Sequence, residues 1–230
     1  MPGPPRLLLF DIDGTLLDCG PQVRPLFEDA LLEVFGTAGD CDAYSFTGRT
    51  DPRIVRDLMT GAGVPEAVVR ELLPRMREVY LAKLERALDR QGMTLLPGVG
   101  EVLAALGARA ARAEVTLALL TGNWEAGART KLSRFDLNRF FPFGAFGSDA
   151  ADRNELPPIA LERAARLAGR RFHPAEALII GDSIYDVECA RAHGIPALAV
   201  TTGRTPAEEL YAAGADWVVP DLTAAAHVLG

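Results

Sequence analysis

The sequence predicts an α/β protein with a parallel sheet and an inserted helical domain. Short, nearly continuous apolar runs alternate with helical segments, a pattern typical of parallel strands covered on both faces. The runs lie at residues 6–10, 115–120, 177–180, 196–200 and 216–219. Roughly a hundred residues separate the first run from the second, whereas the later runs follow at the distances of βαβ units. This uneven spacing predicts an insertion after the first strand.

The inserted segment has helical periodicity along its length. Apolar residues recur at intervals of three and four residues in three successive stretches, as on one face of an amphipathic helix. These positions are Phe27, Ala30, Leu31, Val34 and Phe35; Ile54, Val55, Leu58 and Met59; and Leu72, Leu73, Met76, Val79, Tyr80 and Leu84. Pro97-Gly98 then marks the return to the sheet. We predict a helical cap domain over 17–95, without strands of its own, and a discontinuous core of 1–16 and 96–230.

Composition and charge limit the classes of protein to which the chain can belong. The 230 residues include 31 acidic side chains against 24 Lys and Arg, and the net charge of −7 disfavours a nucleic-acid partner. No apolar run approaches the roughly 18 residues that a membrane span needs. The 3 cysteines, an odd number, fit reduced thiols better than a disulfide framework. We expect a cytoplasmic protein without nucleic-acid or membrane partners; monomer and homodimer both remain open.

Polar residues follow three of the predicted strands where each strand ends. The segments are Asp11-Ile12-Asp13-Gly14-Thr15, Thr121-Gly122-Asn123 and Gly181-Asp182-Ser183-Ile184-Tyr185-Asp186. In open parallel sheets, ligands bind beyond the carboxyl ends of the strands. The sequence therefore predicts a binding or catalytic site at this edge.

Four carboxylates, those of Asp11, Asp13, Asp182 and Asp186, are predicted to converge there. Like charges this close cannot all stay ionised unless a cation compensates them. Oxygen ligands without His or Cys favour Mg²⁺. The alternative is that Asp11 and Asp182 only cap helices or lie in solvated turns. We interpret the group as a Mg²⁺ site.

The same strand ends carry groups suited to phosphoryl chemistry. Asp11 and Asp13 are two residues apart, a spacing that points both side chains the same way as the strand runs into its loop. One carboxylate can form an acyl phosphate while the other protonates the leaving oxygen and then activates water. Thr121, Asn123 and backbone N–H groups near Gly122 are candidate phosphate donors. Asn123 is also a good cap for the helix that follows.

With these segments in this order, the chain resembles the haloacid dehalogenase superfamily in its phosphatase branch, and the phosphoglycolate phosphatase group within it. The segments 10–16, 120–123 and 180–186 are similar to the first, second and fourth motifs of the family. The resemblance implies a Rossmann-like core with a helical cap. It also implies a Mg²⁺-dependent phosphatase for a small phosphorylated metabolite such as phosphoglycolate.

The resemblance also implies roles for individual residues. Asp11 becomes the nucleophile, and Asp13 becomes the general acid/base whose backbone carbonyl binds Mg²⁺. Thr121 becomes a phosphate ligand and Asp182 a Mg²⁺ ligand. Asp186 would bind the metal directly or support the residues that do.

The third motif of the family departs from its usual form, because members usually carry a lysine there. The chain has only Lys83 and Lys131, and neither precedes the fourth motif in the expected segment. Arg153 lies at about the right place, and a guanidinium can screen carboxylates and bind phosphate with two hydrogen bonds. We predict that Arg153 is catalytic. The alternative is an exposed Arg153, with Lys131 reaching the site from the helix after the second strand.

One loop of the insertion is a candidate for substrate recognition. In Thr47-Gly48-Arg49-Thr50-Asp51-Pro52, Asp51 is predicted to cap a helix that begins at Pro52. In family members with this cap the loop faces the catalytic site, so the resemblance makes Arg49 a candidate ligand for a carboxylate or second phosphate. A solvated loop arginine is the alternative.

Two other functions remain open from the sequence. A sugar-phosphate mutase of the same superfamily uses the same core, and a non-catalytic relative could use the cleft for binding or regulation. The pair Asp11 and Asp13 argues against the second, because a protein without catalysis has no need of both.

Overall fold

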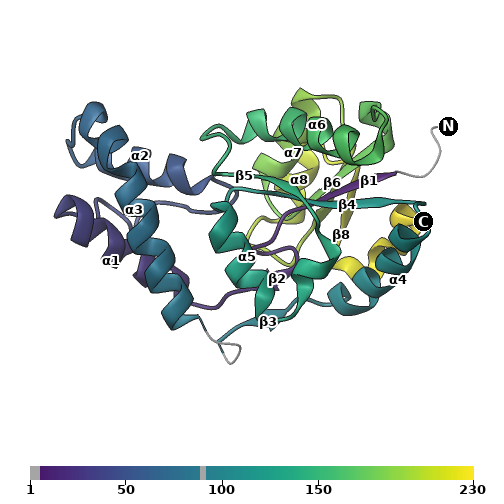
Figure 1. The fold of residues 1–230 in the computed structure, drawn as a ribbon, viewed down its shortest axis with the longest axis horizontal. Coiled ribbons are helices and arrows are strands. Elements are labelled where there is room, and N and C mark those ends of the chain that lie inside the picture. The colour runs from purple at the N-terminus through teal and green to yellow at the C-terminus, as the bar shows by residue number, and fades with distance from the viewer. Residues whose placement is uncertain (1–5, 89–91) are drawn as a thin grey trace.

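The computed structural model describes residues 6–88 and 92–230, and its core is a six-stranded parallel sheet (Figure 1). The strands follow the order β5-β4-β1-β6-β7-β8. Their bounds are β1 Leu7–Phe10, β4 Thr116–Thr121, β5 Gly144–Phe146, β6 Ala177–Gly181, β7 Ala197–Val200 and β8 Trp217–Val219. The predicted α/β class is confirmed. The five predicted strands are present, and β5 at the sheet edge is the strand that the apolar runs did not indicate.

Helices cover both faces of the sheet (Figure 1). The α6, α7 and α8 layer packs on Leu7 and Leu9, whereas α4, α5 and the C-terminal α9 pack on Leu8 and Phe10, so neighbours along β1 point to opposite faces. The helices are α4 Val99–Ala111, α5 Glu125–Ser133, α6 Leu156–Ala168, α7 Ile184–Ala192, α8 Ala207–Ala213 and α9 Ala226–Leu229. Short 3-10 turns are η1 Leu137–Phe140, η2 Arg153–Glu155, η3 Pro174–Glu176 and η4 Leu222–Ala225.

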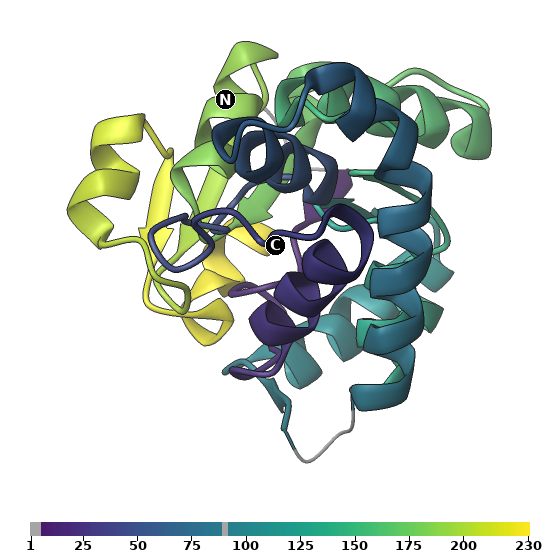
Figure 2. The ribbon, with the colours of Figure 1, turned by 90° about the vertical axis from the view of Figure 1, so that its left-hand side faces the viewer.

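Three helices form the cap between β1 and β4: α1 Val23–Phe35, α2 Asp51–Gly61 and α3 Glu66–Ala87 (Figure 2). At the base of the cap, β2 Leu17–Asp18 and β3 Thr94–Leu95 form an antiparallel ribbon. This corrects the expectation of an insertion without strands, because two residues per strand are too few to show a period. Residues 1–5 of the predicted core and 89–91 of the predicted cap lie outside the described residues. The division into domains stays a prediction.

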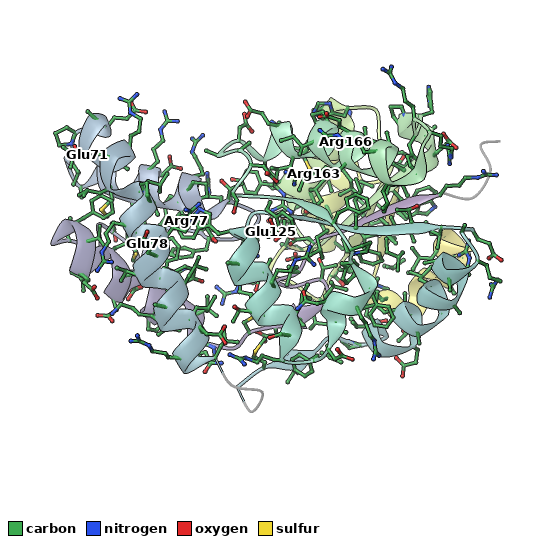
Figure 3. The ribbon with its side chains drawn as sticks, in the orientation of Figure 1. Glu71, Arg77, Glu78, Glu125, Arg163 and Arg166 are labelled. Carbon is green, nitrogen blue, oxygen red and sulfur yellow. The ribbon has the colours of Figure 1, made fainter. Side chains whose placement is uncertain are left out.

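The cap and the core share one apolar cluster. Trp124, just before α5, stacks on Phe27 of α1 at 6.2 Å between ring centroids and contacts Tyr80 of α3 at 5.9 Å. All three side chains are buried. The outer face of α3 is charged, with Glu71, Arg77 and Glu78 in Figure 3. Burial of aromatic rings on both sides of the junction holds one side of the cap against the core.

Within the described ranges, no helix has both the length and the apolar character that crossing a bilayer requires.

Candidate active site

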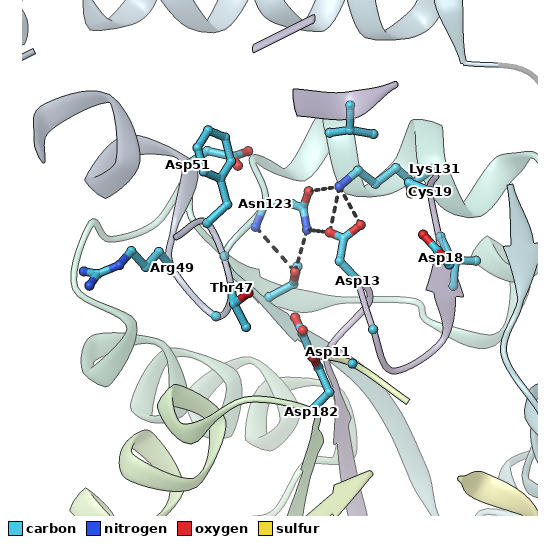
Figure 4. Close-up of a pocket in the computed structure, with 18 of the residues that line it drawn as sticks. Asp11, Asp13, Asp18, Cys19, Thr47, Arg49, Asp51, Asn123, Lys131 and Asp182 are labelled. Carbon is cyan, nitrogen blue, oxygen red and sulfur yellow. Dashed lines mark hydrogen bonds and ion pairs between the residues drawn. The ribbon is translucent and has the colours of Figure 1, made fainter. Parts of the chain in front are cut away.

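A cavity of about 300 Å³ lies between the cap and the carboxyl ends of the strands (Figure 4). The chain runs outward from β1 to β4 and β5 on one side and then crosses to β6 on the other side of β1. Ligand sites of open α/β sheets form where the strand order reverses in this way. The topology therefore places the predicted strand-end residues around one cavity.

Three buried carboxylates meet on the core side of this cavity. Asp11 directly follows β1, Asp182 follows β6, and Asp186 lies in the first turn of α7. One oxygen of each lies within 4.8 Å of the others. Burial raises the pKa of Asp11 to about 7, with Arg153 opposing the shift and Asp186 adding to it. Burial and the charge of Asp11 also raise the pKa of Asp182 well above its ordinary value. A cation among these carboxylates offsets their burial and mutual repulsion, and the three oxygens lie close enough together to hold a metal ion.

Asp186 is more tightly held than the other two carboxylates. It accepts hydrogen bonds from the Ser183 hydroxyl at 2.6 Å and the Ser183 N–H at 3.1 Å, which close a capping box at the start of α7. It also pairs with Arg153. Asp186 therefore takes part in helix capping and in the charge cluster at once.

Arg153 is buried and lies among these carboxylates rather than in solvent. Its Nη2 lies 3.2 Å from Asp11 Oδ1 and pairs with Asp186, while its Nη1 donates to the carbonyl of Gly48 in the cap loop at 3.0 Å. A guanidinium can make these contacts together because its donors form a fixed fork. The arginine thus connects the predicted nucleophile with the cap.

Lys131 enters the same cavity but contacts a different carboxylate. Its Nζ donates to Asp13 at 2.7 and 2.9 Å and to the Asn123 side-chain oxygen at 2.6 Å (Figure 4). Burial would raise the pKa of Asp13, yet the Lys131 ammonium and the Asn123 amide hold it below its ordinary value. The sequence reasoning missed this pairing. Lys131 lies on α5, whereas Asn123 precedes that helix, so no helical spacing in the sequence links the two residues.

The residues after β4 form a hydrogen-bonded group. The Asn123 amide donates to Asp13 Oδ2 at 2.7 Å and to the Thr121 hydroxyl at 2.9 Å, and both Asn123 and Thr121 are buried. The side chain of Asn123 does not cap α5, which corrects that alternative, because its amide is turned toward Asp13. The carbonyl of Gly122 accepts the N–H of Asp51 from the cap at 2.8 Å. Their predicted role in phosphate binding stays a prediction.

Arg49 in the cap loop is engaged at the cap–core interface. Its Nη2 donates to the Tyr185 hydroxyl at 2.9 Å, and Nη1 lies 3.6 Å from Asp57. The guanidinium lies between the rings of Tyr44 and Tyr185, 5.2 and 5.1 Å from their centroids. Figure 4 shows it turned away from Asp11 and Asp13. That Arg49 binds substrate stays a prediction.

The N-cap residue of helix α2 lies one position before the predicted one. Thr50, not Asp51, is the N-cap, since its hydroxyl accepts the N–H of Arg53 at 3.3 Å. The carboxylate of Asp51 instead accepts the N–H of Trp124 at 2.7 Å. Burial raises the pKa of Asp51 to about 7 although Lys131 opposes it. Asp51 thus ties the cap to the start of α5.

Comparisons with known proteins agree with this geometry. The model of the family "Haloacid dehalogenase-like hydrolase" matches residues 8–200. Phosphoglycolate phosphatase 1 of Pseudomonas aeruginosa is 31% identical over 206 residues, which cover 86% of this chain and 70% of that protein. Phosphoglycolate phosphatase of Rhodobacter capsulatus is 31% identical over 208 residues, 88% of each chain.

Solved structures show the same fold. The crystal structure of a predicted phosphatase from Clostridium acetobutylicum superposes with a TM-score of 0.72 at 20% identity and covers 96% of each chain. A predicted phosphoglycolate phosphatase from Haemophilus somnus gives a TM-score of 0.71 at 21% identity and covers 98% of each. With the family model matching most of the sequence, the chain belongs to the haloacid dehalogenase-like hydrolase family, as an enzyme of its phosphatase branch.

Proposed function

We propose that the chain is a Mg²⁺-dependent phosphatase that hydrolyses a small phosphorylated metabolite, phosphoglycolate or a close relative, through an aspartyl phosphate on Asp11. The observation that carries the proposal is the convergence of Asp11, Asp182 and Arg153 beside Asp13 in one cavity. The names of the curated relatives support phosphoglycolate as the first substrate to test.

The donor set fits Mg²⁺. The three clustered groups are carboxylates, and their mutual repulsion is reduced when a dication lies between them. Asp11, Asp182 and the backbone carbonyl of Asp13 would hold the ion. Asp186, already bonded to Ser183 and Arg153, would bind it directly or support it. When bound, the ion would draw electron density from the phosphoryl oxygens and offset charge.

Residues of the chain carry out two steps, the formation of the aspartyl phosphate and its hydrolysis. A carboxylate oxygen of Asp11 attacks phosphorus as the bond to the leaving oxygen breaks, and Asp13 donates a proton to that oxygen. Asp13 next takes a proton from the water that attacks the aspartyl phosphate, which releases phosphate and restores Asp11. Arg153 screens Asp11 and the phosphoryl oxygens. Thr121 and Asn123 would orient the phosphoryl group.

Asp13 is better prepared for the second step than for the first. Paired with Lys131, it is ionised as a base must be. The acid step requires a proton that this contact opposes. We expect substrate binding to weaken the bond between Asp13 and Lys131.

The test is hydrolysis of p-nitrophenyl phosphate and phosphoglycolate with and without Mg²⁺, measured as released phosphate. Asp11→Asn should lose nearly all turnover while far-UV circular dichroism stays unchanged. Glu78→Gln, which removes a carboxylate from the outer face of α3, is the matched control and should retain activity. Full turnover by Asp11→Asn would refute the mechanism. Interconversion of sugar phosphates without phosphate release would indicate the mutase alternative instead.

A further inference from the structure

Five basic side chains line the cavity, and four of them already have partners. Two hold catalytic carboxylates, since Arg153 pairs with Asp11 and Lys131 pairs with Asp13. The other two belong to the cap: Arg49 contacts Tyr185 and Asp57, while Arg24 donates to the carbonyls of Cys41 and Tyr44 and lies over the Phe46 ring. These four cations are engaged by the predicted catalytic carboxylates, within the cap, or at the cap–core interface.

Arg204 is the fifth, and it has no such commitment. Among the residues that the structure describes, it makes no hydrogen bond or ion pair, and its side chain is exposed. It borders both the inner cavity and a second cavity of about 610 Å³ at the cap–core boundary. Arg204 therefore lies where the site opens to solvent, with its guanidinium available.

The backbone beside Arg204 lies directly against the catalytic groups. The Thr202 hydroxyl donates to the carbonyl of Gly14 at 2.6 Å, which ties the loop after β7 to the loop after β1. A Cβ at Gly203 would lie 1.7 Å from Asp182 Oδ2, so only glycine allows this approach. Arg204 is the next residue and lines the same cavity as Asp11.

We propose that Arg204 determines specificity by binding a carboxylate on the leaving group of the substrate. A guanidinium binds a carboxylate through two parallel hydrogen bonds, a geometry that a neutral leaving group cannot match. The phosphoryl end would lie at Asp11 and Arg153, and Arg204 would meet the opposite end from the core side. The substrate class is thus a phosphomonoester with a carboxylate close to the ester oxygen. This inference rests on the proposed phosphatase function.

Two competing partners for Arg204 lie in the chain itself. Glu209 of α8 and Asp42 of the cap border the outer cavity together with Arg204. A surface ion pair with either carboxylate would contribute little to stability and nothing to catalysis. Removal of Arg204 would then change no kinetic constant, which separates the two interpretations.

The experiment measures kcat and KM of the Mg²⁺-loaded enzyme for phosphoglycolate and for ethyl phosphate, which lacks the carboxylate. Arg204→Ala should lower kcat/KM for phosphoglycolate about 10- to 100-fold, mainly through KM, as expected for a lost hydrogen-bonded charge. The kcat/KM of this variant for ethyl phosphate should be nearly that of the wild type. Arg204→Lys keeps the charge but not the two parallel donors, so its kcat/KM for phosphoglycolate should lie between those of the wild type and Arg204→Ala. Arg77→Ala on the outer face of α3 is the matched control and should match the wild type.

The outcomes distinguish this inference from the function on which it rests. Equal losses for both substrates would place Arg204 at the phosphoryl group and overturn the carboxylate role. No loss for either, or a wild type that hydrolyses ethyl phosphate but not phosphoglycolate, would also overturn it while leaving the phosphatase mechanism on Asp11 standing. Failure of the wild type to hydrolyse any phosphomonoester would end both.

Discussion

Asp51 shows at the scale of a single residue what the sequence could not settle. Asp51 and Pro52 predict a helix start, and the helix begins one residue earlier than predicted, at Asp51 itself, with Thr50 as its N-cap. The side chain of Asp51, however, binds the N–H of Trp124, 73 positions along the chain. Local patterns predict local hydrogen bonds. A partner brought close only when the cap folds onto the core leaves no such pattern.

The buried carboxyl of Asp51 is expected to make stability depend on pH. Burial raises its pKa from 3.8 to about 7, so the folded state favours the neutral form. The stabilisation that protonated Asp51 gives the folded state is therefore complete below pH 3.8 and is lost as the pH rises through 7. A pKa difference of about three units corresponds to a free energy of unfolding on the order of 4 kcal/mol. Asp51→Asn keeps an acceptor for Trp124 and removes the titration. The free energy of unfolding of the wild type, measured in urea with a chelator, should fall between pH 4 and 7 relative to this variant. A constant difference across that range would contradict the assignment.

Arg153 carries a second prediction at this scale. The sequence placed a cation near the third motif, and the structure shows why an arginine suits this position. It reaches Asp11 and Asp186 with Nη2 and the cap carbonyl of Gly48 with Nη1, whereas a lysine would have to make all these contacts from one nitrogen. Arg153→Lys should fold but lose roughly 10- to 100-fold in kcat for p-nitrophenyl phosphate. The control is Arg163→Lys. Arg163 lies on α6 and forms a partly exposed ion pair with Asp149, so this variant should keep the wild-type kcat. Wild-type kcat in Arg153→Lys would show that the fork is dispensable.

At the scale of elements, the strands were predictable to the extent that they are long and apolar. The run 177–180 is buried throughout and is found as β6, Ala177–Gly181. β5 escaped prediction because Gly144-Ala145-Phe146 is three residues long and lacks a β-branched side chain. Its strand geometry comes from pairing with β4. The sequence placed Asn123 at the end of a predicted strand and Lys131 on the helix that follows, but their joint contact with Asp13 depends on how α5 packs against the β1 loop.

The start of α2 gives a prediction about an element. The Thr50 hydroxyl caps this helix and also donates to the carbonyl of Ala151 in the core at 2.6 Å. Thr50→Val keeps the shape but removes both bonds, and we expect a loss of about 1–3 kcal/mol in the free energy of unfolding. Thr60→Val, at an exposed position in the last turn of α2, should change it by less than about 0.5 kcal/mol. Urea denaturation of both variants compares them directly, and equal losses would refute the capping role.

At the scale of the whole molecule, chain order predicted which strand ends meet, because parallel strands bring their carboxyl ends to one edge. Asp11, Thr121 and Asp182 come together for that reason. The seating of the cap was beyond the sequence. Periodicity shows that α1 and α3 have apolar faces but not which core surface they cover. In the structure that surface includes Trp124, and a single apolar cluster continues from cap to core.

This shared cluster predicts that cap and core unfold together. Trp217→Phe removes the half-exposed tryptophan of β8 and leaves Trp124 as the fluorescent probe of the junction. In urea, its fluorescence and the far-UV circular dichroism of the whole chain should change in one coincident transition. Phe27→Ala in this background should lower the free energy of unfolding by about 3–5 kcal/mol, as measured by either signal, because a buried ring is lost from the junction. Leu32 is exposed on the same helix, so Leu32→Ala should change the free energy of unfolding by no more than about 0.5 kcal/mol by either signal. A change in Trp124 fluorescence at lower urea than the loss of helix and sheet signal would mean that the cap separates first.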